Sequence, residues 1–382
     1  MLTTTGRRRW LGAAGLLLLA ALAVLVFRGR ARHQVYDFEV YRTAGVRALA
    51  GEPLYRGEDG HWQFKYLPAF ACLIAPIAAL PVMAARGVWF FASVALLVVL
   101  LNRSLRLLPD RRRAAGFLVG LAILALGKFY VREIGLGQSN LLLAVVVLVA
   151  VAAMRAGHDS ASGTLLAFAT VVKPYAILFL PYLIGRRRFR ASAAFLVALL
   201  VALLLPALRY GWQGNVALLA GWWDTVTTST APNLVGQDNI SFAGMYAKWL
   251  GVGPTANWLA IATAILVVVA CGGVLLRRAA MSFPEYLDAS VLLMLMPLLS
   301  PQGWDYVLLG STPAVMLLLD RLNEFRPSVR WLLAACLALA GLTFWDVMGR
   351  EVYRAFMMVS VVTLCALIEI ALVLRLRLRG AA

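Results

Sequence analysis

Apolar runs long enough to cross a lipid bilayer recur from one end of this chain to the other. A transmembrane helix needs roughly 17–25 consecutive apolar residues, because the hydrocarbon core is about 30 Å thick. Backbone polar groups inside hydrocarbon must bond within the chain, so such runs fold as helices. Hydrophobic residues make up 62% of the 382 positions. The sequence therefore predicts an all-α polytopic membrane protein in which residues 1–382 form a single domain.

The placement of arginine orients these helices, because cytoplasmic loops of membrane proteins are enriched in Lys and Arg. We predict about twelve spans with both termini in the cytoplasm, since every arginine-dense loop then lies inside. Residues 28–85 are then a first exoplasmic loop, which contains a short juxtamembrane helix at 66–82. Residues 210–254 form a second exoplasmic loop. The predicted spans are 10–27, 86–104, 114–130, 139–154, 161–173, 174–185, 191–209, 255–276, 287–300, 304–320, 331–347 and 354–374.

The formal net charge of +18 does not indicate a nucleic-acid partner. The arginines lie in short loops between apolar runs, which is the pattern of a protein of the cytoplasmic membrane. The four cysteines lie in apolar runs without CxxC spacing, and the three histidines are scattered. We therefore predict no metal site and no cofactor, and membrane lipids as neighbours of the chain.

Two carboxylates, Asp37 and Glu39, follow the first apolar run at the start of the predicted exoplasmic loop. Asp37 suits a general base that takes a proton from a hydroxyl group. It also suits the N-cap of a helix that ends near Gly51, and the two roles are compatible. Glu39 is an alternative base or a positioning group. Residues two apart point to different faces of a helix, so we favour Asp37 as the base.

A cation stands at an interrupted helix, where Pro174 follows Lys173. A proline disfavours helical geometry in the residue before it, so Lys173 should lie at a break near the outer surface. It is either a snorkelling lysine or a ligand for a phosphate group. Lys128 and Arg132 are spaced i, i+4 and either assist Lys173 or remain solvated. Acceptor-binding or positioning roles are predicted for polar and aromatic residues at the same membrane face: Glu39, Gln138, Asn140, Trp304 and Asp305.

Short motifs succeed one another over about residues 35–310. They are Tyr36-Asp37-Phe38-x-Val40-Tyr41, Gly51-x-Pro53-Leu54-Tyr55, Phe64-Lys65-Tyr66-Leu67-Pro68, Gly137-Gln138-Ser139-Asn140, Lys173-Pro174-Tyr175, Gln237-Asp238-Asn239-Ile240-Ser241 and Ser300-Pro301-x-x-Trp304-Asp305. Their order resembles glycosyltransferase family 87, polyprenyl-phosphate-sugar-dependent mannosyltransferases of the GT-C fold.

The resemblance implies a GT-C-type helix bundle. It also implies inverting transfer of a hexose, mannose in that family, from a polyprenyl-phosphate donor. The acceptor would be a hydroxyl of a lipid-linked or cell-envelope glycolipid or glycan on the exoplasmic face. Asp37 would be the catalytic base, and Lys173 would bind the donor phosphate with Arg132 or Lys128 assisting. Some members carry a histidine soon after the Ser-Pro-x-x-Trp motif, where this chain has Tyr306, which leaves a second acid–base partner open.

A transporter or flippase of lipid-linked substrates is the alternative. Such a protein needs a polar path through the membrane, and the clear intramembrane acid is Glu369 alone. A non-enzymatic scaffold would leave the one-sided cluster of polar residues unexplained.

Overall fold

The computed structural model describes residues 23–31, 35–277 and 283–379. It is 82% helix, and the described residues contain no β-strand, which confirms the all-α prediction. The helical elements are η1 Phe27–Ala31, α2 Tyr36–Ala50, η2 Gly57–Trp62, α3 Pro68–Ala78, α4 Val82–Leu107, α5 Ala115–Leu136, α6 Asn140–Arg155, α7 Asp159–Val172, η3 Pro174–Leu178, α8 Phe179–Gly185, α9 Phe189–Leu204, α10 Ala207–Thr228, η4 Ala231–Asn233, α11 Phe242–Leu250, α12 Pro254–Leu275, α13 Pro284–Leu299, η5 Asp305–Ser311, α14 Thr312–Asp320, η6 Leu322–Glu324, α15 Pro327–Gly341, α16 Trp345–Met348, α17 Arg350–Met358 and α18 Val361–Arg379.

Among the described residues, three helices are long and apolar enough to cross a membrane: α4, α5 and α12. The pairs α9–α10 and α17–α18, bent by 92° and 51°, raise the number to five if each pair is one span. The prediction of about twelve spans is therefore not confirmed. Several predicted spans correspond to short apolar helices, and the 16 residues of α6 reach only about 24 Å. The first predicted span, 10–27, lies mostly outside the described residues.

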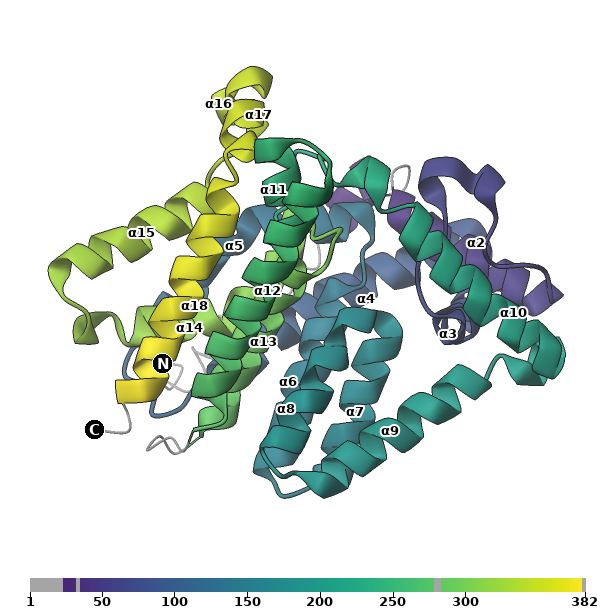
Figure 1. The fold of residues 1–382 in the computed structure, drawn as a ribbon, viewed down its shortest axis with the longest axis horizontal. Helices are drawn as coiled ribbons and strands as arrows, with labels where there is room; N and C mark the ends of the chain where they lie inside the picture. Colours follow the sequence, from purple (N-terminus) through teal and green to yellow (C-terminus); the bar gives the residue numbers. More distant parts are fainter. Residues whose placement is uncertain (1–22, 32–34, 278–282, 380–382) are drawn as a thin grey trace, which may run out of the picture.

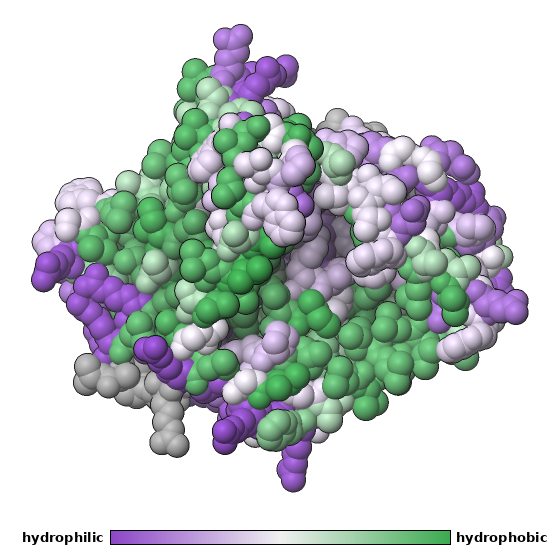
Figure 2. Space-filling view, in the orientation of Figure 1, coloured by the Kyte–Doolittle hydropathy of each residue, from purple (hydrophilic) through white to green (hydrophobic). Residues whose placement is uncertain are grey.

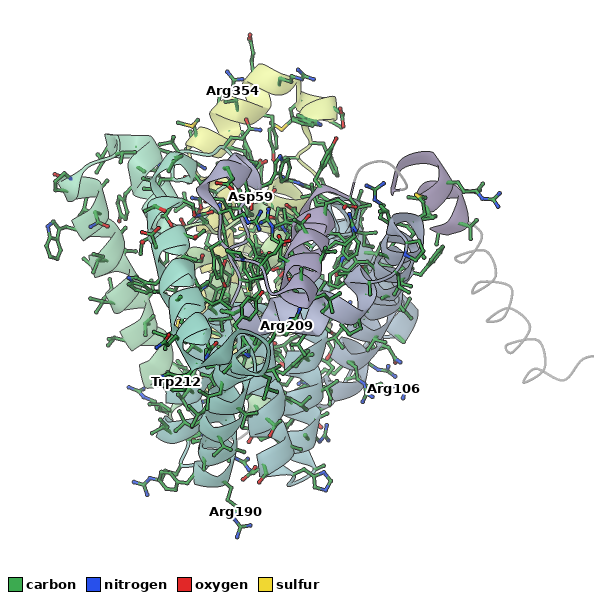
Figure 3. The ribbon with its side chains drawn as sticks, turned by 90° about the vertical axis from the view of Figure 1, so that its right-hand side faces the viewer. Asp59, Arg106, Arg190, Arg209, Trp212 and Arg354 are labelled. Carbon is green, nitrogen blue, oxygen red and sulfur yellow. The ribbon has the colours of Figure 1, made fainter. Side chains whose placement is uncertain are left out.

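The helices surround a buried centre (Figure 1). Helix α13 forms part of this centre, because nearly all its residues from Tyr286 to Leu298 are buried. Helices α5, α15 and α18 lie on one side of it, and α2, α3 and α10 lie on the opposite side. Figure 3 shows Arg106 and Arg190 toward the lower end of the molecule and Asp59 and Arg354 toward the upper end. Arg106 and Arg190 thus lie toward the end of the molecule opposite to Asp59 and Arg354.

The outer helices present apolar side chains to the surroundings. Only 17% of the most apolar window of α12 is buried, and Trp258, Leu266 and Val269 are more than half exposed. Figure 2 shows the resulting hydrophobic surface across this face. A helix that is apolar all round and exposed in the monomer suits a lipid environment. The surface therefore fits a membrane protein.

The sequence predicts a helix break at Lys173 and an N-cap at Asp37, and the structure confirms only the break. The chain breaks at Lys173, which is extended, and Pro174 starts the next helix, as expected. Helix α2 ends at the left-handed Gly51, but Val35 occupies its N-cap position, so the N-cap prediction for Asp37 is wrong. Asp37 lies in the first turn, where a carboxylate still interacts favourably with the helix dipole. The predicted second exoplasmic segment, 210–254, contains most of α10 and all of α11.

Candidate active site

A cavity of about 680 Å³ lies where α2, α10, the end of α5 and the segments around residues 173 and 302 meet. Figure 2 shows a recess between α12 and α10, bordered by hydrophobic surface. Ionisable and amide side chains share the cavity wall with aromatic rings. The ionisable and amide ones are Asp37, His61, Gln63, Lys65, Arg132, Gln138, Lys173, Asn233, Asp238 and Gln302. The aromatic ones are Tyr41, Trp62, Tyr66, Tyr175, Trp222, Trp304 and Tyr306.

Gln138 connects the polar groups of this wall. Its Nε2 donates to Asp37 Oδ2 at 2.8 Å and to the Tyr306 hydroxyl at 3.1 Å. Its Oε1 accepts from Lys173 Nζ at 3.2 Å and from the Tyr41 hydroxyl at 3.0 Å. One buried amide therefore fixes the distance between a carboxylate and an ammonium group that are far apart in the sequence.

Gly137 places Gln138 in this position. It ends α5 in the left-handed conformation, with φ of +72°. Its carbonyl oxygen accepts a hydrogen bond from Trp89 Nε1 at 2.8 Å. A Cβ atom at this position would lie 2.3 Å from Val35 Cγ1 and 2.9 Å from Phe38 Cβ. Only glycine fits a turn that is both left-handed and this close to the start of α2.

Asp37 is a carboxylate in a partly desolvated setting. Burial raises its pKa above the ordinary value of 3.8, and the hydrogen bond from Gln138 opposes that shift. The positive charges of Lys173 and Lys65 also oppose it. A base whose pKa lies above its ordinary value accepts a proton more readily, so the environment suits general-base chemistry.

Lys173 presents its ammonium group beside Tyr66. Its Nζ donates to the Tyr66 hydroxyl at 2.8 Å and lies 4.6 Å from the centre of that ring. The Tyr66 hydroxyl is also 2.7 Å from the Tyr41 hydroxyl. An ammonium group has three donors, and the two hydrogen bonds in the structure leave one for a ligand in the cavity.

The part of the chain that the structure describes holds no group of three or more His, Cys, Asp or Glu side chains that could bind a metal ion. In comparisons with known proteins, residues 64–301, more than half of the chain, match glycosyltransferase family 87. The chain belongs to glycosyltransferase family 87. No curated protein and no solved structure matches it. The resemblance of the short motifs is thus confirmed at the level of the family, and a glycosyltransferase acts on a sugar donor and an acceptor.

The matched part of this family 87 glycosyltransferase includes Arg132, Gln138 and Lys173, whereas Asp37 precedes it. The cavity joins these residues, so the geometry brings Asp37 to the same site. Of the residues predicted from sequence, the cavity contains Asp37, Arg132, Gln138, Lys173, Trp304 and Tyr306. It does not contain Glu39, Lys128, Asn140 or Asp305.

The predicted phosphate ligands on α5 differ in their placement. Arg132 lines the cavity, but its guanidinium donates to Asp238 at 2.9 Å and also to Asp305. Lys128 Nζ lies 3.2 Å from Asp305 Oδ2 and does not face the cavity. Asp305 is fully buried. It therefore serves as the counter-ion that holds both cations of α5, rather than as a group that a substrate reaches.

Glu39 and Asn140 are held by other contacts. Glu39 Oε2 accepts from Arg42 at 3.0 Å, and Glu39 Oε1 accepts from Arg86 at 2.6 Å. Asn140 donates to Glu133 at 2.7 Å, and both side chains are buried. As the i, i+2 spacing predicts, Asp37 and Glu39 point in different directions, because only Asp37 lines the main cavity.

Lys65, for which the sequence predicts no role, lines the cavity and donates to Gln302 Oε1 at 3.3 Å. Burial lowers the pKa of Lys65 below its ordinary value of 10.5. The available signal was a lone cation between Phe64 and Tyr66, directly before the apolar helix α3. A lysine in an aromatic segment next to an apolar helix needs polar surroundings, and the cavity provides them.

Proposed function

We propose that this glycosyltransferase transfers a hexose, specifically mannose, from a polyprenyl-phosphate donor to a hydroxyl acceptor, with inversion at the anomeric carbon. The observation that carries the proposal is the bridge that Gln138 forms between Asp37 and Lys173 in one cavity. A base for the acceptor and a cation for the leaving group are the two charges that such a substitution uses.

In this mechanism, Asp37 takes the proton of the acceptor hydroxyl as its oxygen attacks the anomeric carbon of the donor. The new glycosidic bond forms on the face opposite to the phosphate, and the bond from that carbon to the phosphate oxygen breaks. The electron pair leaves with the polyprenyl phosphate, and the proton remains on Asp37 until solvent removes it. Attack from the opposite face gives inversion.

The departing phosphate gains negative charge, which a fixed cation stabilises most strongly where water is excluded. Lys173 supplies this charge from a buried position, and its unused donor is available to a phosphate oxygen. Lys65 supplies a second positive charge at the same cavity. Arg132 assists from the wall, where Asp238 and Asp305 already neutralise much of its charge.

The surroundings of the cavity suit a donor with a long isoprenoid chain. Apolar side chains of α9 and α12 are exposed, so a lipid tail can remain in the bilayer while its phosphate reaches the polar cavity. The arginine pattern supports the proposal that the cavity opens to the exoplasmic face of the cytoplasmic membrane. A glycolipid or glycan acceptor would meet the donor there.

Sugar transfer in proteoliposomes tests the donor class. We expect purified protein to transfer radiolabelled mannose from polyprenyl-phosphate mannose to acceptors in an extract of envelope glycolipids. GDP-mannose, which has the same sugar and no lipid, should give no transfer. Efficient use of GDP-mannose would contradict the proposed donor.

Labelling of single cysteines with a membrane-impermeant maleimide tests the orientation. Glu58 and Arg190 are exposed, and Glu58 directly precedes Asp59, which lies toward the end of the molecule opposite to Arg190 (Figure 3). We expect Glu58→Cys to react in intact cells and Arg190→Cys to react only after the membrane is opened, each relative to the wild-type background. The reverse pattern would place the active site in the cytoplasm.

A further inference from the structure

A second cavity, of about 360 Å³, lies on the other side of α2. Five of its residues form one stripe of this helix, because their spacing of 3, 1, 3 and 4 follows the helical repeat. They are Tyr36, Glu39, Val40, Thr43 and Arg47, and the 3-10 helix η2 adds Asp59 and Trp62. The structure places Asp59 toward the end of the molecule opposite to Arg190 (Figure 3).

The two cavities adjoin at a common edge. Val40 and Trp62 line both of them. Asp37 lies on the face of α2 toward the main cavity, and Tyr36 and Thr43 lie only in the second one. A ligand bound in the second cavity can therefore extend past Val40 toward the carboxylate of Asp37.

The second cavity combines exposed aromatic rings with fixed polar groups. Tyr36 and Trp62 are stacked with ring centres 5.5 Å apart, yet they remain 48% and 47% exposed. Beside them, the guanidinium of Arg47 donates two hydrogen bonds to Asp59, at 2.5 and 2.8 Å. Such an ion pair fixes hydrogen-bonding atoms in place next to an apolar platform.

A hexose matches this arrangement. One face of its ring carries C–H groups that pack on an aromatic side chain, and its hydroxyls bond to carboxylate and guanidinium groups at the rim. The charged groups of the lining are already paired, Glu39 with Arg42 and Arg86 and Asp59 with Arg47, so the described lining residues hold no uncompensated cation for a phosphate. A neutral sugar is thus the ligand that the charges and the rings both favour.

We propose that the second cavity is a subsite for a neutral hexose unit of the acceptor, adjacent to the unit that receives the transferred sugar. This inference rests on the proposed function, because it uses the main cavity as the place of transfer. It specifies the substrate class: the acceptor carries at least two sugar units, so the enzyme extends a glycan rather than glycosylating a single hydroxyl.

Binding of oligosaccharides to the full-length protein in nanodiscs tests the subsite without catalysis. The probes are methyl α-mannoside, α-linked mannobiose and mannotriose, with maltose and cellobiose series of equal length, measured by calorimetry. We expect at least one two-unit probe to bind roughly tenfold more tightly than its one-unit counterpart. Tyr36→Ala should abolish this advantage, and Tyr36→Phe, which keeps the ring, should retain it.

Trp223→Ala is the matched control, because Trp223 is 64% exposed and lines neither cavity. It should leave the advantage of the longer probe unchanged. Equal binding of one-unit and two-unit probes by the wild-type protein would overturn the subsite, as would an unchanged preference in Tyr36→Ala. The rings would then serve as an interfacial anchor only.

Transfer assays separate failure of the subsite from failure of the proposed function. If the wild-type protein binds the longer probe but does not use polyprenyl-phosphate mannose, the donor assignment fails and the subsite stands. If the wild-type protein transfers mannose and Tyr36→Ala leaves the acceptor KM unchanged, the subsite fails and the proposed function stands. The expected result is an acceptor KM about tenfold higher in Tyr36→Ala with little change in kcat.

Discussion

Replacing Gln138 with leucine tests whether the bridge in the cavity matters for catalysis. Leucine has similar size but neither donates nor accepts hydrogen bonds. The change removes the contacts to Asp37 at 2.8 Å and to Lys173 at 3.2 Å. The Tyr66 hydroxyl still bonds to Lys173, so the ammonium group keeps a partner and the protein should fold.

The two lost contacts set the size of the effect. A hydrogen bond to a charged group contributes about 1.5–3 kcal/mol, so losing both removes about 3–6 kcal/mol if each acts in the transition state. Each 1.36 kcal/mol changes a rate about tenfold. We therefore expect kcat/KM to fall by about 10²–10⁴-fold in Gln138→Leu.

The pH dependence gives a second readout that a structural defect alone would not produce. The hydrogen bond from Gln138 lowers the pKa of Asp37, so its removal raises that pKa further. The base must be ionised to act, and its activity is lost as pH falls through its pKa. The acid limb of the kcat/KM profile should therefore move to higher pH in Gln138→Leu.

Mannose transfer measured over a range of pH, with thermal melting in detergent to verify folding, gives both values. Gln213→Leu is the control, because Gln213 is an exposed glutamine on α10 that lines neither cavity. A folded Gln138→Leu protein with near wild-type kcat/KM and an unmoved acid limb would refute the bridging role.

Three further changes test other parts of the account. Lys173→Ala should weaken use of the donor strongly, whereas Lys173→Arg keeps a charge and should retain part of it, as donor titrations would show. In the wild-type protein, the buried Arg377 Nε lies 2.5 Å from Asp288 Oδ1, and Asp288→Ala removes this counter-ion. We expect a loss of about 3–5 kcal/mol of stability, measured as a lower melting temperature, with the donor KM unchanged. Gly137→Ala puts a Cβ atom 2.3 Å from Val35 Cγ1 at a φ of +72°, so both activity and melting temperature should fall.

Two features that depend on local sequence were predicted correctly, although the N-cap of α2 was not. Pro174 lacks a backbone N–H and restricts its neighbour, so the break at Lys173 needs no tertiary information. The i, i+2 spacing likewise separates Asp37 from Glu39 on any helix. Polar side chains are costly in lipid, so Gln138 and Lys173 could be expected to meet at one polar site.

Features that depend on distant partners were not predictable in the same way. Lys128 and Arg132 lie one helical turn apart, and both contact Asp305, which is distant from them in the sequence. Only Arg132 also lines the cavity, and the spacing of the two residues does not reveal this difference. The predicted number of spans is not confirmed, for a related reason. Hydropathy identifies apolar runs, but it does not distinguish a helix of about 24 Å that packs inside the bundle, such as α6, from one that crosses the bilayer.

Turnover of Asp37→Asn, compared with Glu39→Gln, tests the central claim most directly. Both changes replace a carboxylate with an amide of equal size, and only Asp37 lines the main cavity. With polyprenyl-phosphate mannose in proteoliposomes, we predict that Asp37→Asn lowers transfer by about 10²–10⁴-fold while donor binding persists. Glu39→Gln should keep kcat and change only the acceptor KM, because Glu39 lines the second cavity and not the main one. An active Asp37→Asn protein beside an inactive Glu39→Gln protein would show that the base is not Asp37.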